Sequence, residues 1–172
     1  QTGDLHLGKI FYGNSLFEDQ KFVLKQLIDK VSEAKEKEPY NAIIISGDIY
    51  DRSIPPTEAI EIFDDFLIEL HKIDANLKIL IISGNHDSAT RLSFGTKFLE
   101  KQNIHFCTNP ENCTTPIIIT GNNFKENDKD AICFYQIPFL NSGSLYSEEK
   151  NQRLINQQEL ISEAINRIKI QH

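Results

Sequence analysis

The sequence predicts an α/β fold in which a central sheet is layered with helices. Residues 42–46 and 78–83 consist mostly of isoleucine and leucine, which is typical of buried strands in parallel sheets. Between these two runs, the apolar side chains of residues 57–71 recur at helical spacing, after Pro55 and Pro56. A strand, a helix and a second strand in this order form a right-handed unit, so both strands end at the same edge of the sheet.

Periodicity predicts the remaining elements. Apolar residues repeat at helical spacing through residues 16–37, and Pro39 lies just beyond them, so a helix is expected there. A shorter helix is predicted over residues 88–102, and a broad apolar stripe predicts another helix over residues 148–170. Further strands are predicted over residues 104–107, 116–120 and 131–137. The last two should form a hairpin whose long loop begins at Gly121. With no repeat or linker, residues 1–172 are expected to form one domain.

The composition is near the average of globular proteins, with 40% hydrophobic and 25% charged residues. It contains no apolar run of about 18 residues, so no membrane-spanning helix is expected. The three cysteines lack C-x-x-C spacing, which argues against a zinc ribbon and indicates a reducing compartment, hence a cytoplasmic protein. Cys107 and Cys133 lie in apolar runs and should be buried, whereas Cys113 lies in a polar loop and could be exposed.

Three short acidic and histidine motifs are the most informative part of the chain. They are Asp-Leu-His at residues 4–6, Gly-Asp-Ile-Tyr-Asp at 47–51 and Gly-Asn-His-Asp at 84–87. Each taken alone could be an ordinary turn, because Gly, Asn and Asp are common turn residues. The second and third motifs follow the two predicted strands, so they should meet at one edge of the sheet. This arrangement is typical of two-metal sites that cleave phosphate esters.

The residue types suggest a role for each candidate ligand. Asp48, at a strand end, is suited to bridge two cations. Asp4 and His6 alternate, so on extended backbone they would point to the same side and bind one ion together. Asn85 offers a neutral carbonyl oxygen to the second ion. Carboxylate, carbonyl and imidazole ligands favour Mn²⁺, with Mg²⁺ as the alternative.

The three motifs, in this order, resemble the calcineurin-like metallophosphoesterase superfamily. The flanking residues 47–56 and 83–95 resemble more closely its SbcD family, the nuclease subunits of bacterial SbcCD complexes. The resemblance implies a metal-dependent nuclease that acts as a double-strand exonuclease and a single-strand endonuclease. It also implies roles in DNA repair, recombination and replication. The implied partners are DNA, an SbcC-type ATPase and a second copy of the chain, with no membrane.

The resemblance also assigns residues. It implies that Asp4 and His6 bind one ion, that Asp48 bridges both ions and that Asn85 binds the second. It implies that His86 contacts the scissile phosphate or protonates the leaving oxygen. We expect the neighbouring residue, Asp87, to orient the His86 imidazole by accepting a hydrogen bond from it.

Part of the family's ligand set is missing. The resemblance implies later histidines, one after a further strand and then a Gly-His-x-His pair. His71, His105 and His172 do not stand in such motifs. We therefore expect the chain to be truncated at both ends and to hold only the N-terminal and middle part of the domain. Two alternatives remain: a small-molecule phosphodiesterase of the same superfamily, or a catalytically incomplete scaffold or dimerisation fragment.

Charge and apolar patterning leave two further questions open. A net charge of −7 disfavours DNA binding, because phosphate contacts come from Lys and Arg. Lys9, Arg52 and Arg91 lie near the motifs and are candidate phosphate contacts, although they could be ordinary solvated charges. The helix over residues 57–71 carries two apolar stripes, so it is either a deep core helix or has a dimer face. Phe63 and Phe66 are the candidate dimer residues.

Overall fold

The computed structural model describes residues 1–120 and 131–172. The chain forms two compact units, Gln1–Phe106 and Cys107–His172. The loop predicted to begin at Gly121 lies outside the described residues. That residues 1–172 belong to a single metallophosphoesterase domain stays a prediction. None of the described helices combines the length and the apolarity that crossing a bilayer requires.

The first unit is built on a three-stranded sheet with the order β3 (Ala42–Ser46), β4 (Lys78–Ile82) and β5 (Ile104–Cys107). Strands β3 and β4 are parallel and pair from Ala42 with Lys78 to Ser46 with Ile82. The N-terminal segment runs beside β3, where Thr2 forms a parallel bridge with Ile45. The predicted α/β fold is therefore confirmed.

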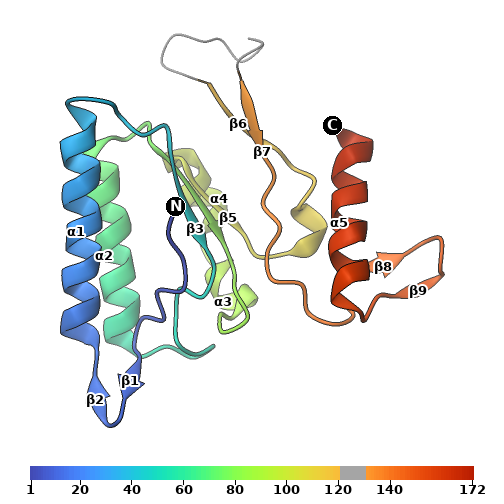
Figure 1. The fold of residues 1–172 in the computed structure, drawn as a ribbon, viewed down its shortest axis with the longest axis horizontal. Helices are drawn as coiled ribbons and strands as arrows, with labels where there is room; N and C mark the ends of the chain where they lie inside the picture. Colours follow the sequence, from blue (N-terminus) through green and yellow to red (C-terminus); the bar gives the residue numbers. More distant parts are fainter. Residues whose placement is uncertain (121–130) are drawn as a thin grey trace. The chain divides into compact units, whose positions relative to one another are not determined.

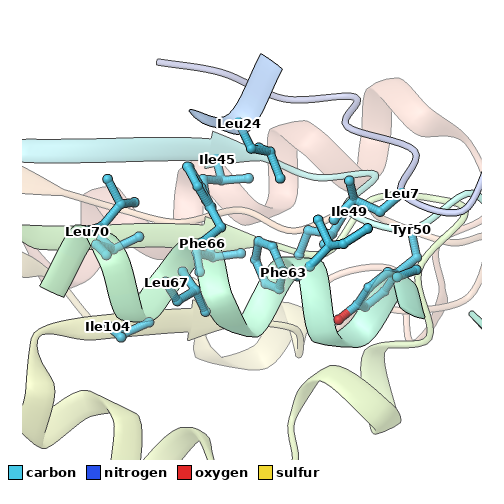
Figure 2. Packing of buried hydrophobic residues seen from close by; sticks show 14 residues of the cluster. Leu7, Leu24, Ile45, Ile49, Tyr50, Phe63, Phe66, Leu67, Leu70 and Ile104 are labelled. Atoms are coloured by element: carbon cyan, nitrogen blue, oxygen red, sulfur yellow. The ribbon is translucent and has the colours of Figure 1, made fainter. Parts of the chain in front are cut away.

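Two helices cover this sheet and were both predicted. Helix α1 (Phe17–Lys35) and helix α2 (Thr57–Ile73) lie side by side (Figure 1). Apolar side chains of α2 enter the same core as Leu24 of α1 and Ile45 of β3, and Figure 2 labels four of them. These four are Phe63, Phe66, Leu67 and Leu70.

The burial of α2 corrects the proposed dimer face. Phe63 is 4% exposed and Phe66 is 3% exposed, and both belong to the core of the unit. They cannot form a contact surface for a second copy without unfolding this core. The helix is apolar on two sides because it packs against both α1 and the sheet, which is the deep-core alternative.

The predicted helix over residues 88–102 is wrong as a continuous element. It is divided into α3 (Ala89–Leu92), α4 (Thr96–Leu99) and the 3₁₀ helix η1 (Glu100–Gln102). Gly95 separates α3 from α4 with a φ of 74°, a left-handed conformation that glycine adopts without steric cost. A hairpin of β1 (Ile10–Phe11) and β2 (Asn14–Ser15) was also not predicted.

In its described residues, the second unit has two hairpins and a short 3₁₀ helix beside a small core. The predicted hairpin is confirmed as the antiparallel pair β6 (Ile117–Ile119) and β7 (Ile132–Phe134). A second hairpin joins β8 (Tyr146–Ser147) to β9 (Gln152–Arg153), and a short 3₁₀ helix, η2, covers Pro110–Asn112. The core of this unit contains Cys113, Leu140, Leu145, Leu154, Leu160 and Ala164.

Helix α5 (Gln157–Gln171) begins nine residues later than the predicted start at residue 148. The side chain of Asn156 accepts hydrogen bonds from the backbone N–H groups of Gln158 and Glu159, which caps the helix at this point. The residues before Asn156 form the β8–β9 hairpin instead.

Two of the three cysteine predictions are wrong. Cys107 is buried as expected, and burial raises the pKa of its thiol to about 12. Cys113 is fully buried in the core of the second unit, whereas Cys133 is exposed on β7. The apolar neighbours of Cys133 in the sequence did not reveal which face of the short strand would carry its side chain.

Candidate metal centre

The candidate site lies where the N-terminal segment meets the loops that follow β3 and β4. The backbone N–H of Asp4 donates to the carbonyl of Gly47, and that of His6 donates to the carbonyl of Asp48. One residue further on, Leu7 N–H donates to the carbonyl of Ile49. These bonds attach the first motif to the second along their backbones, as expected for motifs that share one edge of a sheet.

The backbone at the site is left-handed, which corrects the expectation of an extended segment. Asp4 has a φ of 51°, His6 of 43° and Asp48 of 48°. Non-glycine residues rarely adopt such values, and strained residues of this kind cluster at functional sites. The side chains of Asp4 and His6 still converge, but a strained turn brings them together rather than the alternation of a strand.

The first three candidate ligands form a compact group. Nε2 of His6 lies 4.0 Å from Oδ1 of Asp4 and 3.9 Å from Oδ2 of Asp48. An ion about 2.1 Å from each ligand atom would hold those atoms about 3–4 Å apart, so the group fits a divalent cation. The Asp4 side chain is 80% exposed and that of Asp48 only 11%, so the group opens to solvent on one side.

The third motif is attached to the other oxygen of Asp48. Oδ1 of Asp48 accepts a hydrogen bond of 2.9 Å from the backbone N–H of His86. Gly84 lies so close that an added Cβ would meet this oxygen at 2.1 Å. Asp48 therefore faces His6 with one oxygen and the loop after β4 with the other. Asn85, between Gly84 and His86, is exposed at this loop.

The His86 ring is oriented by Asp51, not by Asp87. Nδ1 of His86 lies 2.8 Å from the main-chain carbonyl of Asp51, so this nitrogen must donate. The ring also packs edge-on against that of His6, with the centroids 4.8 Å apart. The donor role of Nδ1 leaves Nε2 available to a substrate.

Asp87 joins the second and third motifs through their backbones. Its Oδ2 accepts hydrogen bonds from the N–H groups of Gly84 and Ile49, and its Oδ1 accepts one from Tyr50. The expectation that Asp87 orients His86 is therefore wrong, since these backbone donors occupy its carboxylate. Asp87 instead links the loop after β3 to the loop after β4 through hydrogen bonds to their backbones.

Asp51 is the functional residue that the sequence did not single out. Its Oδ1 accepts a 2.8 Å hydrogen bond from Nζ of Lys9 and lies 3.5 Å from Nδ1 of His6. The hydrogen bond from Lys9 lowers the pKa of Asp51 below its usual value. The one available signal was its position, three residues after Asp48 within the same motif.

A second group of potential ligands contains His6, Asp51 and His86. Lys9 already neutralises the Asp51 carboxylate, and the Asp51 carbonyl already binds His86. Nδ1 of His6 is buried and finds no hydrogen-bond partner among the described residues, although the Asp51 carboxylate is nearby. A carboxylate beside the second nitrogen of a histidine ligand is a common outer-shell arrangement, so this group supports the first rather than competing with it.

The remaining candidates are two arginines and three histidines. Arg52 and Arg91 are exposed, and the described parts of the chain offer neither side chain an ion pair. Their role as phosphate contacts stays a prediction. His105 lies in β5, where burial lowers its pKa, and Nδ1 of His172 lies 2.9 Å from the hydroxyl of Tyr135. The potential ligand groups found among the described residues include neither of these histidines, nor His71.

The chain is similar to one known protein family and to named nuclease subunits. The family described as Calcineurin-like phosphoesterase matches residues 1–169. The SbcD subunit of the nuclease SbcCD from Staphylococcus epidermidis is 34% identical over 164 residues, which cover 95% of this chain and 40% of that relative. Its namesake from Staphylococcus saprophyticus is 36% identical over 138 residues, covering 80% of this chain and 33% of the relative. The chain thus spans less than half the length of these two relatives.

Proposed function

Because the chain belongs to the calcineurin-like phosphoesterase family, we propose that it carries the metal-binding part of a nuclease that hydrolyses phosphodiester bonds in DNA. One observation carries the proposal. The ligand atoms of Asp4, His6 and Asp48 lie within 4.8 Å of one another, and the loop of His86 is hydrogen-bonded to Asp48. Relatives that are named as nuclease subunits support DNA as the substrate.

We propose Mn²⁺ as the metal, with Mg²⁺ as the alternative, and two ions per site. Asp4 and His6 would hold the first ion, Asp48 would contact both, and Asn85 would contribute its carbonyl oxygen to the second. Oxygen and imidazole donors without a thiolate suit this choice of metal. When bound, such ions polarise the phosphoryl group and supply a strong nucleophile at neutral pH.

The side chains around the ligands have separate tasks in this proposal. The bond from His86 Nδ1 to the Asp51 carbonyl fixes the ring and directs Nε2 to the substrate. From there Nε2 could hydrogen-bond the scissile phosphate or deliver a proton to the leaving oxygen. Lys9 holds Asp51 in place by their 2.8 Å ion pair. Asp87 keeps the loops of Asp48 and His86 together.

The whole protein would act with partners. We propose an SbcC-type ATPase as the partner subunit, because the relatives are named as subunits of SbcCD. The net charge of −7 is compatible with DNA binding only if other segments, the partner or a second copy provide basic surface. A homodimer stays part of the proposal, without Phe63 and Phe66 at its interface. A cytoplasmic location and roles in DNA repair, recombination and replication complete it.

The test uses the full-length protein with Mn²⁺, measuring metal binding by calorimetry and cleavage of linear duplex DNA. Asp48→Asn keeps an oxygen for the His86 N–H but loses the charge that faces His6, so cleavage should fall about 1000-fold. Asp65→Asn, an exposed acidic position on α2, is the matched control and should cleave like the wild type.

The alternatives give different outcomes. Hydrolysis of a chromogenic phosphodiester without DNA cleavage would indicate a small-molecule phosphodiesterase. A wild-type protein that binds Mn²⁺ and cleaves neither substrate would point to a scaffold role. Full activity in Asp48→Asn would remove Asp48 from the site.

A further inference from the structure

Gln20 of α1 uses all of its side-chain hydrogen-bonding groups on the loop that carries the first motif. Its Nε2 donates to the carbonyl of Leu5 at 3.1 Å and to the carbonyl of His6 at 2.7 Å. Its Oε1 accepts the backbone N–H of Gly8 at 3.1 Å. A glutamine amide offers two N–H donors and one carbonyl acceptor, so each of its groups is satisfied by this loop.

The loop needs such support because of its backbone. Asp4, His6 and Gly8 all have positive φ values, of 51°, 43° and 87°. Left-handed non-glycine residues cost about 1–3 kcal/mol each and persist only where the surroundings hold them. The strained segment is held on one side by the loop that follows β3, through the hydrogen bonds of Asp4 and His6, and on the other side by Gln20.

We propose that Gln20 is a positioning residue for the metal site, which fixes the loop of Asp4 and His6 before any ion binds. The inference rests on the proposed function, since it assigns Gln20 a task at that same site. Gln20 does not touch the ligand atoms. It acts through the carbonyls of Leu5 and His6, which flank the residue whose imidazole faces Asp48, and through the N–H of Gly8.

The position of Gln20 suits this task. It lies in the first turn of α1, and its own backbone N–H donates to the carbonyl of Leu16, so a helical turn holds its backbone. Its side chain is partly buried. Glutamate would lack both donors and would place a carboxylate against two carbonyls, while lysine or arginine would lack the acceptor for Gly8. Only an amide of this length matches the three loop groups.

The experiment compares Gln20→Leu and Gln20→Glu with Gln26→Leu in the full-length protein. Gln26 lies on the same helix and is exposed, so its replacement is the matched control. Mn²⁺ affinity is measured by calorimetry well below the unfolding temperature. Hydrogen–deuterium exchange of residues 5–8 is measured without metal. Both Gln20 variants should bind Mn²⁺ about 10- to 100-fold more weakly and exchange this segment faster. Gln26→Leu should match the wild type in both measurements.

A purely structural role would lower the unfolding temperature and leave the Mn²⁺ affinity of the folded protein unchanged, which would overturn the inference. Unchanged exchange in residues 5–8 would also overturn it. A wild type that binds no Mn²⁺ would refute the metal site of the proposed function, and the inference with it. This failure is seen before any variant is measured, so the two failures are distinguishable.

Discussion

The backbone N–H of His86 donates a hydrogen bond of 2.9 Å to Oδ1 of Asp48, so the loop after β4 contacts the carboxylate that follows β3. The contact couples the second motif to the third without a side chain of the third motif taking part. Any change that moves the loop of residues 84–87 should therefore move Asp48 as well.

Gly84→Ala should disrupt the metal site through this contact. The added methyl group would lie 2.1 Å from Oδ1 of Asp48, so the carboxylate or the loop must shift. We expect Mn²⁺ affinity to fall at least about tenfold and the free energy of unfolding to fall by about 1–3 kcal/mol. Gly95→Ala is the control, because an added Cβ would meet nothing within 4 Å although φ is 74°. It should lose stability and keep its Mn²⁺ affinity. Equal affinities for both variants would contradict the prediction.

Asp87→Ala should destabilise the protein rather than change the behaviour of His86. It removes the acceptor of the N–H groups of Gly84, Ile49 and Tyr50. An unsatisfied buried donor costs about 1–3 kcal/mol, so we expect a loss of about 3 kcal/mol or more in urea unfolding of the metal-free protein. Asp29→Ala, exposed on α1, should stay within about 0.5 kcal/mol of the wild type. An equally small loss in Asp87→Ala would restore the possibility that Asp87 acts on His86.

Phe66→Ala should lower the stability of the first unit. It should leave the oligomeric state of the folded protein unchanged. The side chain is only 3% exposed, and truncating a buried phenylalanine costs about 3–5 kcal/mol. Ile68→Ala, on the same helix but 43% exposed, should cost far less. Urea unfolding measures both changes, and light scattering reports the mass of the folded protein. A stable Phe66→Ala variant of half the wild-type mass would reinstate the dimer face.

The ion pair of Lys9 and Asp51 should give stability that depends on pH. The hydrogen bond from Lys9 lowers the pKa of Asp51 in the folded state. A carboxyl group with a lowered pKa stabilises the fold above its unfolded-state pKa of about 3.9, and this contribution is lost as the pH falls through the folded-state pKa. Lys9→Met should therefore cost about 0.2–1 kcal/mol at neutral pH, and the difference should vanish in acid.

Urea unfolding of metal-free protein at a series of pH values checks this dependence. Lys25→Met, exposed on α1, is the control and should show no such convergence with the wild type. If the difference between Lys9→Met and the wild type persisted to the lowest pH, the ion pair would not be its source.

The sequence predicted the helices and strands that form because of a pattern within their own segment. Strand β3, helix α2 and strand β4 were predicted nearly to the residue, because a run of isoleucine and a helical apolar pattern are properties of the segments themselves. The break at Gly95 was not predicted, since a single glycine conformation ended a stripe in which Phe94 and Phe98 turn out to be exposed. At α5 the apolar stripe continues on the N-terminal side of Asn156, so the predicted helix began too early, before the residue that caps it.

The site divides in the same way. The second and third motifs were predicted to meet at one edge of the sheet, and the backbone N–H of His86 does donate to Asp48. The resemblance implied that Asp4, His6 and Asp48 share ions, and their ligand atoms do converge. The tasks of Asp51, Asp87 and Gln20 depend on main-chain groups that become neighbours only in the folded chain. A residue type cannot reveal such bonds, because any carboxylate or amide could accept or donate them.

The left-handed backbone at Asp4, His6 and Asp48 bears on how this protein should be engineered. Glycine would relieve the local strain at each position, and at Asp4, which is largely exposed, few side-chain contacts would be lost. A library screened only for heat tolerance would therefore drift toward glycine at Asp4 first, and would discard a proposed ligand while the fold improved. Directed evolution of this chain should keep a metal-dependent readout in every round.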